Sequence, residues 1–143
     1  MTTMTHDITH RQVQLVQRTW KIFQQIDHNL VGAIFYGKLF ADHPHLRKLF
    51  PKHMESQHKK LIDMLSLIVT HMERPLLIEE AMASSGKRHE GYGVKPEYFA
   101  YVGDAFLWML ERGLGTDWND EVREAWANCY QFAVEMMTKN RKD

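Results

Sequence analysis

The sequence has one cysteine, Cys129, so it cannot form an internal disulfide bond. It also lacks an N-terminal segment in which basic residues precede an apolar run and a cleavage site, which is the pattern of a secretory signal peptide. Its apolar stretches, such as Leu61–Val69, are interrupted by polar side chains and fall short of the roughly 20 residues that span a bilayer. These absences predict a soluble, cytoplasmic protein with no membrane segment.

Neither sign of charge predominates in the sequence. Lys and Arg number 18 and Asp and Glu number 18, which gives a pI near 7.1. A protein that holds nucleic acid or anionic lipid by charge needs a basic excess, so we expect neither as a partner. The nine histidines show no zinc-site spacing, since there is no HExxH motif and one cysteine. A metal site therefore needs a different argument.

Strand-like alternation is also missing. Nearly every segment has the period of an amphipathic helix, which predicts an all-α fold, and 143 residues with 44% hydrophobic content suit one domain. Thr9 followed by Gln12 is a capping-box pattern, so we expect a flexible N-terminal segment at residues 1–8 and a helical domain at 9–143. Gly32 in the second helix is small enough to let another helix cross closely.

Caps and breakers predict where the helices begin and end. The expected helices run from Thr9 past Phe23, from Asp27 or Asn29 to Ala41, from Pro44 to about Phe50, from Glu55 to Glu73, from Leu76 to Glu90, from Pro96 to about Gly113, and from a cap at Thr116 or Asp117 onward.

Three polar side chains lie on otherwise apolar helical faces. His89 ends a stripe that begins at Ile78, and it is either a core histidine bonded to a backbone carbonyl, which is the commoner case, or a haem iron ligand. Gln57 begins the stripe that continues through Leu61 and is either an exposed first-turn residue or a pocket residue. Tyr36 suits the core, where its hydroxyl needs a partner.

Four blocks of sequence together resemble a known family: FYGKLFADHPHLRKLF at 35–50, SQHKKLIDMLSLIV at 56–69, GKRHEGYGVKPEYFAYVGDAFL at 86–107 and EVREAWANCYQFA at 121–133. This pattern is similar to the bacterial single-domain haemoglobins and to the globin part of flavohaemoglobins, and within that group to the thermoglobin and Hell's Gate globin type. The resemblance covers the chain from about Thr9. It implies a globin fold, a three-over-three helical sandwich around haem b.

The resemblance also implies roles for individual residues. It makes His89 the proximal ligand of the haem iron, and it places Tyr36 and Gln57 on the distal side as hydrogen-bond donors to the bound ligand. The place of Gln57 assumes a short corner after Phe50. A longer corner would bring His53 or His58 toward the iron instead.

The remaining residues implied by the resemblance surround the haem. The apolar ones are Phe50, Leu61, Val94 and Phe99, and Lys60 and Arg88 are candidate partners of the haem propionates, although exposed charged residues are more often simply solvated. Flavohaemoglobins have a tyrosine where this chain has Phe99, and their partner glutamate aligns near Asp143. Because such partners make the proximal ligand more basic, their absence favours reversible binding over O–O cleavage.

These residues together predict reversible binding of O₂, and of NO or CO, at a five-coordinate haem iron. One alternative is an NO dioxygenase, which would need a separate reductase because we expect no room in the chain for flavin and nicotinamide domains. Another is a haem-based gas sensor, and a third is a haem-free helical bundle.

Overall fold

The computed structural model describes residues 8–72 and 97–138, with side chains up to residue 135. Every element in these ranges is helical, as the sequence predicted, and the expected helix at 76–90 lies outside them. The elements are α1 (His10–Phe23), α2 (His28–Asp42), the 3-10 helix η1 (Pro44–Leu49), α3 (Glu55–Thr70), α5 (Tyr98–Leu114), the 3-10 helix η2 (Gly115–Asp117) and α6 (Asp120–Thr138).

The first two helices begin where the sequence places their caps. At the start of α1 the backbone N–H of Gln12 donates to Thr9 Oγ1 at 3.0 Å, and the backbone N–H of Thr9 donates to Gln12 Oε1 at 3.2 Å. This reciprocal pair confirms the capping box. Of the two candidate caps of α2, the structure selects Asp27, whose Oδ1 accepts from the backbone N–H of Asn29 at 2.9 Å.

The expected start of the last helix was wrong. Thr116 and Asp117 belong to η2, and α6 begins at Asp120, where Asn119 Oδ1 accepts from the backbone N–H of Val122 at 2.9 Å. The reason is that Gly115, with a φ of 55°, turns the chain into a short 3-10 segment before a new helix can begin. The helix α3 also ends at Thr70, before its expected end.

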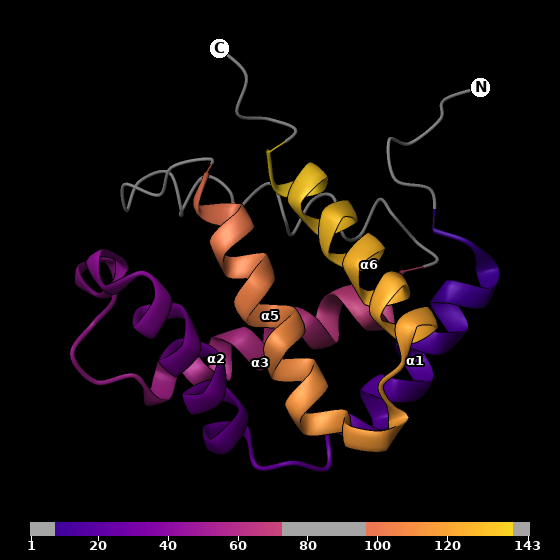
Figure 1. Ribbon diagram of the computed structural model, residues 1–143, viewed down its shortest axis with the longest axis horizontal. Coiled ribbons are helices and arrows are strands. Elements are labelled where there is room, and N and C mark those ends of the chain that lie inside the picture. Colours follow the sequence, from indigo (N-terminus) through magenta and orange to yellow (C-terminus); the bar gives the residue numbers. More distant parts are fainter. Residues whose placement is uncertain (1–7, 73–96, 139–143) are drawn as a thin grey trace.

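Figure 1 shows α3 and α5 between α2 on one side and α1 on the other. The helix α2 packs against both α3 and α5, and α1 packs against α6, α5 and α3. A buried hydrogen bond joins the two ends of the described chain, because Trp126 Nε1 on α6 donates to Thr19 Oγ1 on α1 at 2.9 Å. No helix of the described residues is long and apolar enough to cross a membrane.

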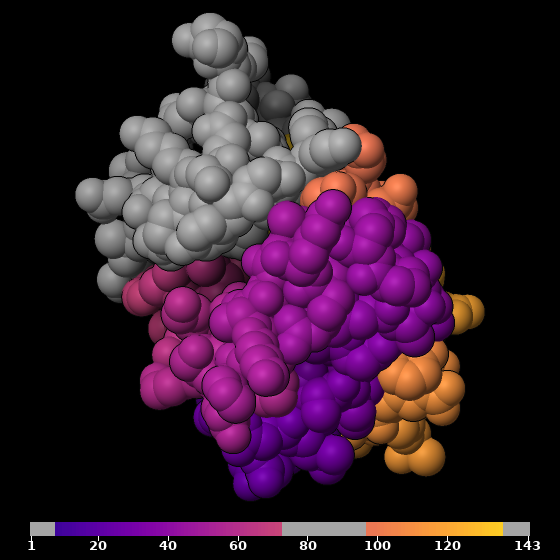
Figure 2. All heavy atoms as spheres, turned by 90° about the vertical axis from the view of Figure 1, so that its left-hand side faces the viewer, coloured from indigo at the N-terminus to yellow at the C-terminus, as the bar shows by residue number. Residues whose placement is uncertain are grey.

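The crossing of α2 and α3 positions the candidate site. A Cβ atom added to Gly32 would lie 2.4 Å from Cγ of His58 on α3, a distance that real side chains do not reach. The expectation that Gly32 permits a close helix approach is therefore confirmed. Figure 2 looks onto this side of the molecule, where α2, η1 and α3 lie next to one another.

Candidate functional site

Tyr36 of α2 lies at the centre of a ring of aromatic side chains and is 7% exposed. The rings of Phe35 and Phe50 meet it edge-on at centroid distances of 4.7 and 5.4 Å, and Phe40 and His58 lie more nearly parallel to it at 5.9 and 5.8 Å. Burial raises the pKa of Tyr36 to about 12, and a side-chain hydrogen bond with Gln57 acts in the opposite direction. The hydroxyl therefore keeps its proton near neutral pH and can donate a hydrogen bond.

Gln57 reaches Tyr36 from a different helix. It lies in the first turn of α3 and is half-buried, and its side chain is near enough to the Tyr36 hydroxyl to oppose the effect of burial on the pKa of Tyr36. Taken alone, a glutamine in a first turn is more often exposed, so the partly buried position and the tyrosine partner are informative. The structure thus brings together two of the predicted polar residues, from α2 and α3.

The predicted apolar residues Phe50 and Leu61 border this pair and are both half-buried. Phe50 contacts Tyr36 edge-on, as described above, and Leu61 lies one turn after Gln57 on α3. The expected apolar stripe of α3 ran through Leu61, but the deeply buried position in this turn is Ile62. Large apolar side chains that are left half-buried beside Tyr36 and Gln57 fit the edge of a flat apolar cofactor such as haem.

Phe99 lies elsewhere in the described structure, in the first turn of α5, where it is half-buried. Its backbone carbonyl accepts a hydrogen bond from the Tyr130 hydroxyl at 2.5 Å, and burial raises the pKa of Tyr130. Phe99 is therefore not brought into the ring of aromatics around Tyr36. The bond holds the start of α5 against α6, and nothing in the spacing of the sequence indicated Tyr130.

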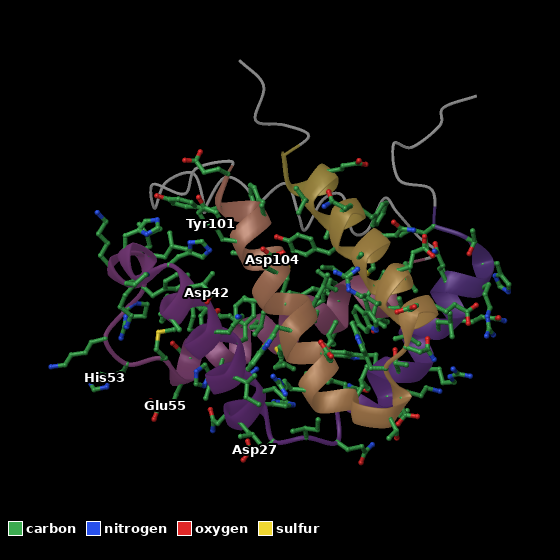
Figure 3. The ribbon with its side chains drawn as sticks, in the orientation of Figure 1. Asp27, Asp42, His53, Glu55, Tyr101 and Asp104 are labelled. Carbon is green, nitrogen blue, oxygen red and sulfur yellow. The ribbon has the colours of Figure 1, made fainter. Side chains whose placement is uncertain are left out.

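The sequence places His58 near the haem iron only if the corner after Phe50 is longer. The imidazole packs on Gly32 and lies parallel to Tyr36 at an interplanar angle of 19°. Its Nδ1 is 3.3 Å from Asn29 Oδ1. Gly32 indicated that another helix crosses α2 closely, but the sequence did not indicate which side chain of that helix packs on the glycine. His53 is exposed, and Figure 3 shows it at the outer edge of the molecule.

The other predicted residues contribute less to the described site. Lys60 is exposed on α3. His89, Val94, Arg88 and Asp143 lie outside the described residues. Within the described part of the chain, no group of three or more His, Cys, Asp or Glu side chains could hold a metal ion.

A hollow of about 160 Å³ lies on the surface along α5 and the start of α6. Its lining residues are Asp104, Leu107, Trp108, Glu111, Trp118 and Arg123. None of the predicted site residues is among them. Figure 3 labels one of the lining residues, Asp104 of α5. The chemistry of the chain is therefore better sought where the buried Tyr36 hydroxyl lies beside the half-buried Gln57 amide.

Comparison with known proteins identifies the family of the chain. The family model for globins matches residues 33–137, which contain the whole Tyr36 site. The chain belongs to the globin family, and it is accordingly a haem-binding protein that takes small gaseous ligands. The half-buried apolar side chains beside the polar pair fit that cofactor.

Individual globins cover nearly the whole chain. A neuroglobin from Tetraodon nigroviridis is 26% identical over 92% of this chain and 91% of its own length, and a neuroglobin from Danio rerio is 24% identical over the same shares. A bacterial globin from Campylobacter jejuni superposes with a TM-score of 0.78 at 20% identity, over 94% of this chain and all of that one. The globin fold predicted from the sequence is therefore confirmed.

Proposed function

We propose that the chain, through its domain at 9–143, reversibly binds O₂ at haem b, with His89 as the proximal ligand and Tyr36 and Gln57 as hydrogen-bond donors on the distal side. When bound, haem supplies the ferrous iron that takes the diatomic ligand. The observation that carries the proposal is the pair formed by the buried Tyr36 and the half-buried Gln57, contributed by two helices that cross closely. Phe50, Leu61, Val94 and Phe99 would line the cofactor.

The residues of the chain supply what O₂ needs in such a pocket. O₂ bound to ferrous haem would carry partial negative charge and be a good hydrogen-bond acceptor, whereas CO would stay nearly apolar. The Tyr36 hydroxyl keeps its proton because burial raises its pKa to about 12. The aromatic rings around it exclude water that would compete for its hydrogen bonds. Each bond to a charged acceptor contributes roughly 1.5–3 kcal/mol, and about 1.4 kcal/mol is a factor of ten.

The test is the rate of O₂ dissociation, measured by stopped-flow displacement with CO. We expect Tyr36→Phe to speed O₂ dissociation by at least about tenfold, and Gln57→Leu to have a smaller effect. CO dissociation should change little in either variant. Tyr101→Phe is a matched control, since Tyr101 is half-buried on α5 and stacks on His43 rather than on the Tyr36 site. Equal O₂ rates in wild type and Tyr36→Phe would contradict the proposal.

The proximal assignment has its own test. We expect His89→Ala to lose most of its haem, measured by the Soret absorbance, and added imidazole to restore part of it. His45→Ala is the control, since His45 is exposed on η1. Full haem with an unchanged spectrum in His89→Ala would show that another residue is the ligand.

The same polar pair also suits an NO dioxygenase, because O₂ held there by hydrogen bonds is placed to react with NO. The activity would need electrons from a separate reductase. Sustained NADH-dependent consumption of NO with an added reductase would favour this alternative, and a specific partner protein would favour a gas sensor. We also propose that the chain is a globin of the thermoglobin type and that it is located in the cytoplasm.

A further inference from the structure

His58 makes three contacts that fix its ring between α2 and α3. Its imidazole lies over Gly32, where a Cβ atom would meet Cγ, Cδ2 and Cβ of His58 at 2.4, 2.6 and 2.7 Å. Its Nδ1 is 3.3 Å from Asn29 Oδ1, so the ring donates to that oxygen when Nδ1 carries the proton. The third contact is the parallel packing on Tyr36.

The contact of Tyr36 with His58 differs from its other aromatic contacts in the helix that supplies it. Phe35 and Phe40 belong to α2 itself, and Phe50 follows η1, whereas His58 belongs to α3. His58 is also the sequence neighbour of Gln57. The Tyr36 ring is thus held against the same helical turn that supplies its hydrogen-bond partner.

We propose that His58, anchored by Asn29, is a positioning residue that sets the orientation of Tyr36 so that its hydroxyl and the Gln57 amide converge on one ligand. A tyrosine ring rotates about two side-chain bonds, and a flat partner on its face restricts both. Removing that partner lets the hydroxyl take more than one orientation, and only some of these reach the ligand. The inference rests on the proposed function, in which Tyr36 donates to bound O₂.

The first measurement is O₂ dissociation from the haem-loaded protein. We expect His58→Ala to speed it by about threefold or more, the size of effect found between residues in direct contact. His58→Phe keeps a flat ring on Tyr36 and should restore most of the wild-type rate. Asn29→Leu removes only the anchor and should have an intermediate effect. His53→Ala is the control, since His53 is exposed and precedes the same helix.

The second measurement is the infrared C–O stretch of the CO complex, which reports hydrogen-bond donors near the ligand. A single narrow band is expected for wild type and His58→Phe. A broadened or split band is expected for His58→Ala and Asn29→Leu, because the hydroxyl then takes several orientations. A lost packing contact that merely lowered stability would leave the band unchanged.

A double-mutant comparison separates this inference from the proposed function. In a Tyr36→Phe background, His58→Ala should add nothing to the O₂ rate, because the positioned group is gone. If Tyr36→Phe itself leaves the rate unchanged, the proposed function fails. If Tyr36→Phe speeds dissociation but His58→Ala does not, or speeds it equally in both backgrounds, the positioning role is wrong. Should His58→Ala not hold haem, wild-type rates and bands in Asn29→Leu would overturn the inference.

Discussion

Two glycines of α2 should respond in opposite directions to the same substitution. A Cβ atom on Gly32 would lie 2.4 Å from His58 Cγ, whereas a Cβ atom on Gly37 would meet nothing within 4 Å. Both residues are inside the helix, so alanine brings the same gain in helix propensity at either position, about 0.5–1 kcal/mol. Gly37→Ala should therefore stabilise the protein.

Gly32→Ala carries an additional cost because the atom nearest the new methyl belongs to a ring held on several sides. Extra volume in a well-packed core costs about 1–3 kcal/mol. Since the propensity gain cancels between the two variants, they should differ by about 1–3 kcal/mol in the free energy of unfolding. For a chain of this length that is a difference of roughly 3–10 °C in Tm. Thermal unfolding of the haem-loaded proteins, followed by circular dichroism, measures it.

The same substitution tests the link from packing to function. A methyl on Gly32 either displaces His58, which frees the Tyr36 ring, or moves α3 away from α2, which separates Tyr36 from Gln57. We therefore expect Gly32→Ala to speed O₂ dissociation while Gly37→Ala leaves it unchanged. Equal Tm values for the two variants would refute the close crossing, and a lowered Tm with a wild-type O₂ rate would refute the claim that the crossing positions the site.

Three further predictions follow from the buried polar groups. Burial raises the folded-state pKa of Tyr36 from the usual value near 10 to about 12. Its contribution to stability is therefore complete below pH 10 and is lost between pH 10 and pH 12, by about 2–3 kcal/mol. Urea unfolding across this range should show a smaller loss in Tyr36→Phe than in wild type, and parallel curves for the two proteins would contradict the prediction. Thr19→Val leaves the buried indole N–H of Trp126 without its acceptor and should lower the free energy of unfolding by about 1–3 kcal/mol. Thr19→Ser keeps the hydroxyl and should lower it less. Equal losses in the two variants would show that the hydrogen bond is unimportant. Cys129 is buried and its pKa is raised to about 12, so a thiol reagent should modify it slowly in the native protein and rapidly in denaturant, and fast native labelling would contradict its burial.

Local chemistry explains which helix boundaries could be predicted. Thr9 and Asp27 cap their helices through bonds to residues two or three positions away, so the sequence contains the whole interaction. The start of α6 could not be predicted in the same way. Thr116 and Asp117 are good caps by residue type. The positive φ at Gly115 begins a 3-10 turn that includes both residues, so Asn119 caps the helix instead.

The site required a different kind of information. Helical periodicity marked Tyr36 and Gln57 as polar residues on apolar faces, yet on that basis alone a core tyrosine and an exposed glutamine were the better interpretations. Their convergence depends on how α2 crosses α3, which no local pattern encodes. The family resemblance carried that long-range information. It did not indicate that Tyr130 of α6 holds the start of α5 by a hydrogen bond to the backbone carbonyl of Phe99.

In the proposed function, the fold and the binding of the ligand depend on the same atoms at the crossing of α2 and α3. Gly32 lets α3 approach, and the space it leaves is filled by His58 rather than by another small residue. A close contact between two small residues would hold the helices together without touching Tyr36. A ring in that place holds the helices together and also lies on Tyr36, close to Gln57, the residue before His58. Substitutions at the crossing should therefore alter stability and ligand retention together, whereas substitutions at Thr19, in the contact between α1 and α6, should alter stability alone.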